Sequence, residues 1–454
     1  MIDKLKININ DKDLLEILRG GGVSFFLRIL GIVIGLILTW LIAELFESEG
    51  LGIYVLSLTL LRMFSLFAKI GLDISSVRFI SSFISQNKFS SIVLFRRKIL
   101  IIAAISSIFS SLLMYFFAID ISNLMQIDSK YIQLNAFFIL PTSFFMINYQ
   151  SLRGLKRIAE FSFFYRVAQS LFTIIFILII YDFNQSQEIP IYAYLLSILL
   201  VSFFSFLSLR YSLNIITKGQ ESADLELMSY VSLFKVSIPL MLAQSVQFIM
   251  AWTDKLMLGA IDTPNVINGL ATNAEEVGVY HIAFRLSMFA AIALMSINSI
   301  ISPKISEMFS RNDMIGLEKI VHQSTKIIFW TSLPLVIIFF TFPSFFLGIF
   351  GDGEEFQSGI VAFLLLSLAR LISALSGPVG NILQMTGHQN SYAKILFLGA
   401  LINILLNLIL IPDYGINGAA IASTSSLIFW NISMVLLVKN KFGFYTFYIP
   451  FIKR

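Results

Sequence analysis

Basic side chains inside otherwise apolar stretches are the residues of this sequence best suited to do chemistry. Four arginines lie a third to a half of the way into segments long enough to span a bilayer, namely Arg28, Arg62, Arg285 and Arg370. A charge at the bilayer centre costs about 2.5 to 3.5 kcal/mol on insertion scales, so these side chains should face water or a partner. Because all acidic residues fall in loops or at segment borders by this assignment, the membrane interior is expected to be purely cationic. An anionic ligand is then the natural counter-ion.

Three other basic residues, Lys69, Arg166 and Lys235, lie within a turn or two of the expected cytoplasmic ends of their segments. Their long side chains can reach the interface, and this snorkelling explains them best. Snorkelling, or pairing with carbonyls at helix ends, is also the structural alternative for the four deeper arginines. Asp73 and Asp254 lie only at segment borders by this assignment, so no coupling ion is predicted.

The sequence offers few groups for other chemistry. It has no cysteine and three scattered histidines, so a metal site or a thiolate nucleophile is not expected. No GxxxxGK[ST] loop is present, and all loops are short, the longest spanning roughly residues 251–276. We therefore expect no catalytic residue, no metal and no cofactor. The net charge of +5 is assigned to cytoplasmic loops rather than to nucleic-acid binding.

Apolar helices must position the arginines. The chain has 454 residues, of which 57% are hydrophobic and 13% charged, and this leaves too little polar surface for a soluble globule. Apolar runs long enough to cross about 30 Å of hydrocarbon recur along the chain, and no cleaved signal peptide is expected. The runs predict twelve spans, which start near Gly22, Gly50, Ile99, Tyr131, Phe161, Ile189, Val231, Val277, Ile327, Ser358, Tyr392 and Gly415.

The charges of the loops predict the orientation of the spans. With the N-terminus inside, the cytoplasmic segments hold twenty-three basic residues, whereas the outer loops hold only Lys130 and Lys255. The outer loops instead collect acidic residues such as Glu47, Asp128 and Glu188. The positive-inside rule then places both termini in the cytoplasm.

A weak internal repeat divides the spans into two sets of six. Gly52 and Tyr54 in EGLGIYVLSL match Gly278 and Tyr280 in EEVGVYHIAF at an offset of 226 residues, and LRGLKRIAEF matches LQMTGHQNSY at an offset of 233. The polar stretch 211–229 separates the two sets. We predict a parallel repeat with six-helix halves at residues 1–215 and 216–454, and a substrate path between the halves.

Three blocks of the sequence resemble the oligosaccharide flippase or polysaccharide transporter family, which is related to multidrug and toxin extrusion transporters and to lipid II flippases. The first runs from FLRILGIVIGL to LDISSVRFISSF, the second joins SIPLMLAQSVQFIMAWTDKLMLG to ISPKISEMF, and the third contains GNILQMTGHQNSY and the turn YGINGAA. The resemblance implies an all-α polytopic membrane protein of about twelve transmembrane helices. Its six-helix halves would be related by a pseudo-two-fold axis and form a V around a central cavity.

The resemblance also implies a function that is not enzymatic. A flippase of this kind moves an oligosaccharide repeat unit on an undecaprenyl pyrophosphate lipid from the cytoplasmic to the outer leaflet by alternating access, for O-antigen or capsule biosynthesis. The expected partners are this lipid-linked oligosaccharide, membrane lipid and other polysaccharide-assembly proteins. The expected location is the bacterial inner membrane.

This interpretation gives the deep arginines a role. Two from each half would bind the pyrophosphate through their planar sets of N–H donors. Amide side chains at helical spacings are candidate sugar contacts, although hydrogen bonds between helices explain them equally well. They form the pairs Gln244 and Gln247, Asn381 and Gln384, and Asn403 and Asn407.

Three other functions stay open. A cation-coupled multidrug antiporter would place carboxylates at membrane depth, and the sequence assignment finds none. A membrane polysaccharide polymerase or acyltransferase would need a catalytic acid and base, usually on a large outer loop, and the outer loops are short. An assembly scaffold that transports nothing would have no use for buried arginines.

Overall fold

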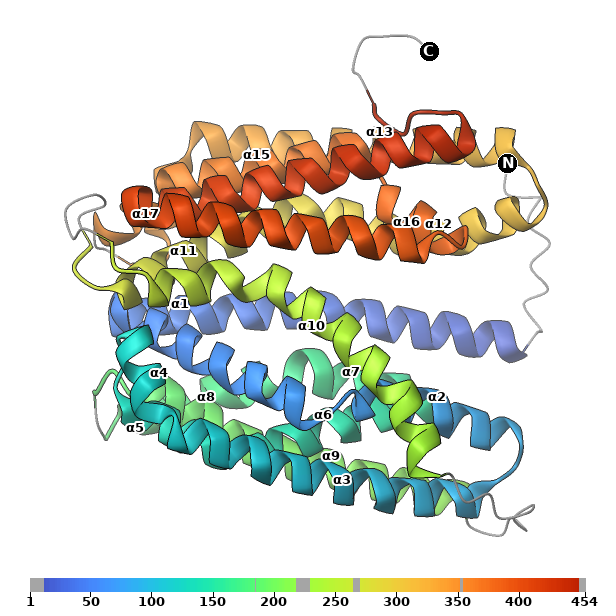
Figure 1. Ribbon diagram of the computed structural model, residues 1–454, viewed down its shortest axis with the longest axis horizontal. Coiled ribbons are helices and arrows are strands. Elements are labelled where there is room, and N and C mark those ends of the chain that lie inside the picture. Colours follow the sequence, from blue (N-terminus) through green and yellow to red (C-terminus); the bar gives the residue numbers. More distant parts are fainter. Residues whose placement is uncertain (1–11, 184, 218–228, 264–269, 352–353, 449–454) are drawn as a thin grey trace. The chain divides into compact units, whose positions relative to one another are not determined.

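The computed structural model of the chain describes residues 12–183, 185–217, 229–263, 270–351 and 354–448, and all regular elements in these ranges are helices (Figure 1). The elements are α1 (Lys12–Ala68), α2 (Leu72–Ser85), α3 (Phe89–Phe116), α4 (Ala118–Met125), α5 (Ser129–Phe137), α6 (Ile139–Gly154), α7 (Ile158–Phe163), the π-helix η1 (Phe164–Ala168), α8 (Gln169–Tyr181), α9 (Ile189–Thr217), α10 (Tyr230–Ala260), α11 (Asn273–Ser287), the 3-10 helix η2 (Met288–Ala291), α12 (Ile292–Ser310), α13 (Met314–Thr341), α14 (Pro343–Gly348), the 3-10 helix η3 (Glu354–Gly359), α15 (Ile360–Ser376), α16 (Val379–Met385) and α17 (Gln389–Phe442).

The apolar helices confirm the prediction of an all-α polytopic membrane protein. Within the described ranges, eight helices are long and apolar enough to cross a membrane, or nine if a bent pair in α10 counts as one span. Two of them are far longer than the roughly 20 residues that one crossing needs, and each contains a break, at Glu47 in α1 and at Gly415 in α17. Every predicted span start lies in a helix, with Ser358 in η3 directly before α15.

The break in α17 explains the YGINGAA sequence. Gly415 has a φ of 51°, in the left-handed region that favours glycine. A Cβ atom on Gly418 would clash with the carbonyl oxygen of Leu410, on the other side of the break. The two glycines therefore let α17 turn sharply and let its two arms approach closely.

The helices form two compact units. Unit 1 comprises Met1–Ile42, Ser57–Ser122 and Asp128–Ser245, and unit 2 comprises Ala43–Leu56, Asn123–Ile127 and Val246–Arg454. The predicted boundary at residue 215 lies near the end of α9, and residues 218–228 of the polar stretch lie outside the described residues. The division into halves at residues 1–215 and 216–454, the pseudo-two-fold axis and the V shape stay predictions.

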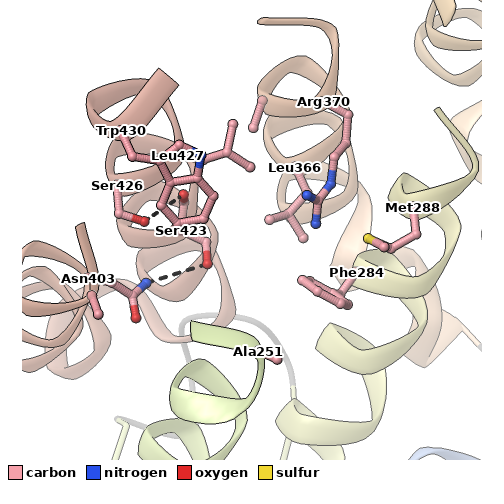
Figure 2. A pocket seen from close by; sticks show the side chains of 12 residues that line it. Ala251, Phe284, Met288, Leu366, Arg370, Asn403, Ser423, Ser426, Leu427 and Trp430 are labelled. Carbon is pink, nitrogen blue, oxygen red and sulfur yellow. Dashed lines mark hydrogen bonds between the residues drawn. The ribbon is translucent and has the colours of Figure 1, made fainter. Parts of the chain in front are cut away.

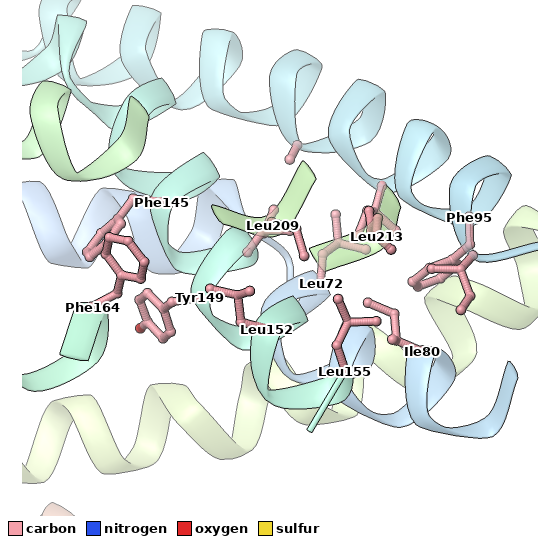
Figure 3. Packing of buried hydrophobic residues seen from close by; sticks show 14 of the residues in the cluster. Leu72, Ile80, Phe95, Phe145, Tyr149, Leu152, Leu155, Phe164, Leu209 and Leu213 are labelled. Atoms are coloured by element: carbon pink, nitrogen blue, oxygen red, sulfur yellow. The ribbon is translucent and has the colours of Figure 1, made fainter. Parts of the chain in front are cut away.

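The interior of unit 1 is apolar where α2, α6 and α9 meet (Figure 3). Figure 3 shows Ile80 of α2, Leu152 of α6 and Leu209 of α9 among the side chains of this cluster, and each is at most 1% exposed. Gly154 allows α6 to approach α2, because a Cβ atom there would lie 3.1 Å from the Cβ atom of Ile80. Lipid tails are as apolar as leucine, so close packing rather than exclusion of water stabilises this core.

Unit 2 is built around α15, which packs against α11, α13 and α17. The second arm of α1 approaches α11 through the glycines of the internal repeat. A Cβ atom on Gly52 would clash with the Ala274 carbonyl, and one on Gly278 would clash with the Ser48 carbonyl. The two repeat-related glycines thus allow one backbone-to-backbone contact between helices, as small residues do in membrane proteins.

Candidate substrate and coupling site

A cavity of about 210 Å³ lies inside unit 2 among α10, α11, η2, α15 and α17 (Figure 2). Figure 2 shows Arg370 and Phe284 on one side of it, and Asn403, Ser423 and Trp430 on the other. The lining combines one cation, an amide, hydroxyl groups and aromatic rings. Such a mixture suits a ligand that is both charged and rich in hydroxyl groups.

The guanidinium of Arg370 is held without a full set of hydrogen-bond partners. Its Cζ atom lies 5.4 Å from the centroid of the Phe284 ring, a cation–π distance. Its buried Nε atom has no acceptor among the described residues. Asp254 exerts an electrostatic attraction on the group. Arg370 therefore has a donor available to a ligand in the cavity, as expected for a substrate-binding residue.

Asp254, near the end of α10, is the centre of a hydrogen-bond cluster beside this cavity. It is 7% exposed. Its Oδ1 atom accepts from Nδ2 of Asn403 at 2.9 Å and from Nδ2 of Asn407 at 2.8 Å. Its Oδ2 atom accepts from the Tyr280 hydroxyl at 2.6 Å and from the Ser423 hydroxyl. One carboxylate thus joins α10, α11 and both arms of α17.

Four donors surround the carboxylate of Asp254. An ionised carboxylate accepts only, and its two oxygens offer about four lone-pair sites. Four donors occupy them here, which offsets the cost of burying the charge. Asn403 and Asn407 can both reach Oδ1 because a spacing of four residues puts them on one helix face. The four donors thus match the acceptor sites that this carboxylate offers.

The expectation of a purely cationic membrane interior is wrong. The sequence assignment began an outer loop near Ala251, but α10 continues to Ala260 and carries Asp254. Lys255, assigned to the same loop, is also in α10 and 3% exposed, with its Nζ atom 4.3 Å from the centroid of the Trp252 ring. The polar residues do not end the helix because partners from later helices satisfy them.

A second buried carboxylate lies in unit 1. Asp73 is 1% exposed, and its Oδ2 atom lies 2.6 Å from Nζ of Lys69. Gln244, in the first part of α10, donates to the same oxygen at 3.1 Å. The prediction that Lys69 snorkels is therefore wrong, since its ammonium group is buried in an ion pair. Gln244 makes the hydrogen bond between helices that was the alternative to a sugar contact.

The four predicted arginines fall into both units. Arg28 and Arg62 are half-buried on α1 in unit 1, where Arg62 interacts electrostatically with Tyr149 of α6. Arg285, half-buried in the last turn of α11, belongs to unit 2 together with Arg370. Joint binding of a pyrophosphate by all four stays a prediction.

The other amides predicted as sugar contacts differ in their surroundings. Asn381 of α16 donates to the carbonyl of Asn298 of α12 at 3.2 Å, so it links two helices. Gln384 is exposed and donates to the carbonyl four residues earlier in its own helix. The side chain of Gln247 lies outside the described part of the structure. Sugar binding by these amides stays a prediction.

Two family models match the chain. The polysaccharide biosynthesis protein model matches residues 17–309. The MatE model matches residues 239–409. Among curated proteins, the chain is 27% identical over 168 residues to a probable low-salt glycan biosynthesis flippase, Agl15, of Haloferax volcanii, a match that covers 35% of this chain and only 34% of the flippase. It is 24% identical over 411 residues to an uncharacterized membrane protein of Methanocaldococcus jannaschii, covering 85% and 77% of the two chains.

Solved structures show the same fold. The lipid II flippase MurJ in an inward closed conformation superposes with a TM-score of 0.68 at 16% identity, covering 93% of this chain and 87% of that one. A MATE transporter of Vibrio cholerae gives a TM-score of 0.59 at 12% identity, covering 94% and 98%. A transporter of the MOP superfamily from Pyrococcus furiosus, described as having a binding pocket of reverse polarity, gives 0.51 at 16% identity, covering 94% of each.

These matches confirm the resemblance that the sequence blocks predict. The polysaccharide biosynthesis protein model covers more than half of the chain, and the superposed flippase and transporters cover nearly all of it. The chain is a multi-pass membrane protein with the fold of the lipid II flippase and the MATE transporters, and it belongs to the polysaccharide biosynthesis protein family.

Proposed function

We propose that the protein is a flippase that moves a lipid-linked oligosaccharide repeat unit from the cytoplasmic to the outer leaflet by alternating access. In this proposal the carrier is an undecaprenyl pyrophosphate lipid, and the product serves a surface polysaccharide such as O-antigen or capsule. Both termini are cytoplasmic, and other polysaccharide-assembly proteins are partners. Membership of the family and the similarity to a glycan biosynthesis flippase support the proposal.

The observation that carries the proposal is the cavity beside Arg370. Its buried Nε atom can donate to a phosphate oxygen. The donors of Asn403, Ser423 and Ser426 are used within the protein, but their oxygen atoms can accept hydrogen bonds from the hydroxyl groups of a sugar. The volume of about 210 Å³ is below the roughly 300 to 1,000 Å³ of pockets for whole small ligands. We therefore assign to it the headgroup region of the substrate rather than the whole oligosaccharide.

Asp254 is the proposed coupling group. A proton or a monovalent cation that reached this carboxylate would compete with the four donors that hold α10, α11 and α17 together. Its electrostatic interaction with Arg370 links that event to the cavity. Charge on Asp254 and occupancy by an anionic headgroup would then influence each other, as coupled transport requires.

Transport by a reconstituted protein tests the role of Arg370. The full chain is placed in vesicles loaded on one leaflet with a lipid-linked oligosaccharide, and exposure of the sugar on the other leaflet is followed with a lectin. The variants are Arg370→Gln, Arg370→Lys and, as a control, Arg311→Gln, which removes an exposed arginine paired with Glu307.

We expect Arg370→Gln to slow transport about 10- to 100-fold, since hydrogen bonds to charged groups contribute about 1.5 to 3 kcal/mol. Arg370→Lys should restore only part of the rate, because a point charge cannot reproduce the planar donor set. Arg311→Gln should transport normally. Full transport by Arg370→Gln in a folded protein would exclude Arg370 from the substrate site.

A cation-coupled multidrug antiporter is the second candidate. The sequence argued against it because no carboxylate was assigned to membrane depth, and the buried Asp254, which lies in the bent candidate span of α10, weakens that objection. The MatE model also matches residues 239–409. Deletion of the gene separates the two functions. Loss of surface polysaccharide with accumulation of lipid-linked repeat units supports the flippase, whereas intact polysaccharide with raised drug sensitivity supports the antiporter.

A further inference from the structure

Two arginines of unit 1 face each other across a tight helix contact. Ser24, Arg28 and Gly31 are spaced along one face of α1. The hydroxyl of Ser162 in α7 donates to that of Ser24 at 3.1 Å. A Cβ atom on Gly31 would lie 2.7 Å from the carbonyl oxygen of Arg166 in η1. Because these two contacts flank Arg28 on the same face, Arg28 lies opposite the turn that carries Arg166.

The charges of this pair have no carboxylate counter-ion in the part of the chain that the structure describes. The two guanidinium groups of Arg28 and Arg166 repel each other. In the described ranges no carboxylate lies within ion-pair distance of either group, and the buried Nε atom of Arg166 finds no acceptor there. The guanidinium carbon of Arg166 lies 5.2 Å from the centroid of the Tyr165 ring, and its snorkelling stays a prediction. Two like charges with an unused donor form a site for an anion.

The same turn also borders an apolar groove. The π-helix η1 interrupts the α7–α8 helix, and such turns are rare and often lie at functional sites. Phe164 in this turn lines a groove of about 520 Å³ between the α7–α8 series and α9. The remaining apolar walls of the groove come from Phe163, Phe172, Phe204, Leu207 and Tyr211.

We propose that this region binds the lipid carrier of the substrate, with its phosphate on Arg28 and Arg166 and its polyprenyl chain in the aromatic groove. The inference rests on the proposed flippase function and adds a second place for the carrier, used at a different step of transport from the one in which its phosphate occupies the headgroup cavity of unit 2. Phe163, which lines the groove, lies three residues before Arg166, and this spacing makes the two side chains neighbours on the helix surface, so both parts of one amphiphile can be held together.

The chemistry of the site favours this occupant over bulk phospholipid. Most of the wall residues are aromatic, and ring faces pack well against the branched, unsaturated units of a polyprenyl chain. In the proposed orientation η1 follows the cytoplasmic start of α7, so the cations lie in the leaflet where the substrate is made. An unpaired cation pair also selects against zwitterionic lipids, which bring their own positive charge.

The absence of cysteine allows a direct test. Ser208, a small residue of the groove, is replaced by Ser208→Cys and given a nitroxide label in the full-length protein in nanodiscs. A label at Phe109→Cys, a 63% exposed position on α3, is the control. The probes are a long-chain polyprenyl phosphate, the neutral polyprenol, and phosphatidic acid with ordinary acyl chains.

We expect polyprenyl phosphate to immobilise the label at Ser208 and to leave the label at Phe109 unchanged. Arg166→Gln should weaken this effect about tenfold, as expected for one lost charge-assisted contact, and Arg166→Lys should restore part of it. Equal immobilisation by phosphatidic acid or by polyprenol would overturn the proposal, since the groove would then hold any lipid.

The vesicle transport assay keeps this inference distinct from the proposed function. If the protein transports lipid-linked oligosaccharide but the label at Ser208 does not respond to polyprenyl phosphate, the groove is not the carrier site and the flippase function stands. If the label responds selectively but no oligosaccharide crosses, the carrier site stands and the flippase function falls.

Discussion

Replacement of Asp254 by asparagine tests the cluster that joins α10, α11 and α17. The carboxylate accepts four hydrogen bonds, whereas an asparagine oxygen can keep at most two of them, and its amide group would face the remaining donors. At about 1.5 to 3 kcal/mol for each bond to a charged group, the loss of two amounts to about 3 to 6 kcal/mol. This is a large part of a typical stability of about 5 to 15 kcal/mol.

Heating the detergent-solubilised protein gives the measurement, with tryptophan fluorescence and size-exclusion chromatography as readouts. Asp254→Asn should unfold at a clearly lower temperature, and Asn407→Ala, which deletes one donor, should lie between it and the wild type. Asp413→Asn, at an exposed carboxylate, is the matched control and should change stability by at most about 0.5 kcal/mol. If Asp254→Asn unfolded together with the wild type, the cluster would not stabilise unit 2 and the reasoning would fail.

The remaining predictions concern packing, topology and pH. Gly278→Ala should destabilise the protein by about 1 to 3 kcal/mol because its methyl group has no space, whereas Gly348→Ala, where a Cβ atom has ordinary contacts, should melt like the wild type. A cysteine introduced at Glu188 should react with an impermeant reagent from outside and one at Lys88 should not, and the reverse pattern would disprove the orientation. The pKa of Glu188 is lowered by hydrogen bonds from Lys130 and Tyr192. The small stabilising effect of these bonds should therefore be present above the unfolded glutamate pKa of about 4.3 and be lost as the pH falls through the lower pKa of the folded state. Melting curves of Glu188→Gln should lack this dependence.

The helices were predictable because bilayer thickness sets their length. Long apolar runs bounded by polar residues indicated where spans start, and every predicted start lies in a helix or directly before one. The breaks at Glu47 and Gly415 were also foreseen as starts of new spans near Gly50 and Gly415. The end of α10 was not predicted correctly, because the sequence WTDK interrupts the apolar run and resembles the start of a loop.

The buried carboxylates were missed for different reasons. The pair Lys69 and Asp73 could have been found, since a spacing of four residues puts opposite charges on one helix face. The hydrogen-bond cluster around Asp254 could not have been found in this way. Its donors come from helices far along the chain, and a single sequence does not show which helices pack together. The spacing of Asn403 and Asn407 placed the two amides on one helix face. It did not show that both donate to Asp254.

The two buried carboxylates differ in when their partners become available during synthesis. Lys69 and Asp73 leave the ribosome together, so their pair can form at once and lower the cost of burying either charge. Asp254 has to wait, because Asn403 follows it by 149 residues and chains grow at about 5 to 20 residues per second, a delay of roughly 7 to 30 s. Unit 2 is therefore incomplete until α17 is made, and a chain that stops before Asn403 leaves Asp254 with Tyr280 as the one remaining donor of the four. Assembly of this unit ends with its last long helix.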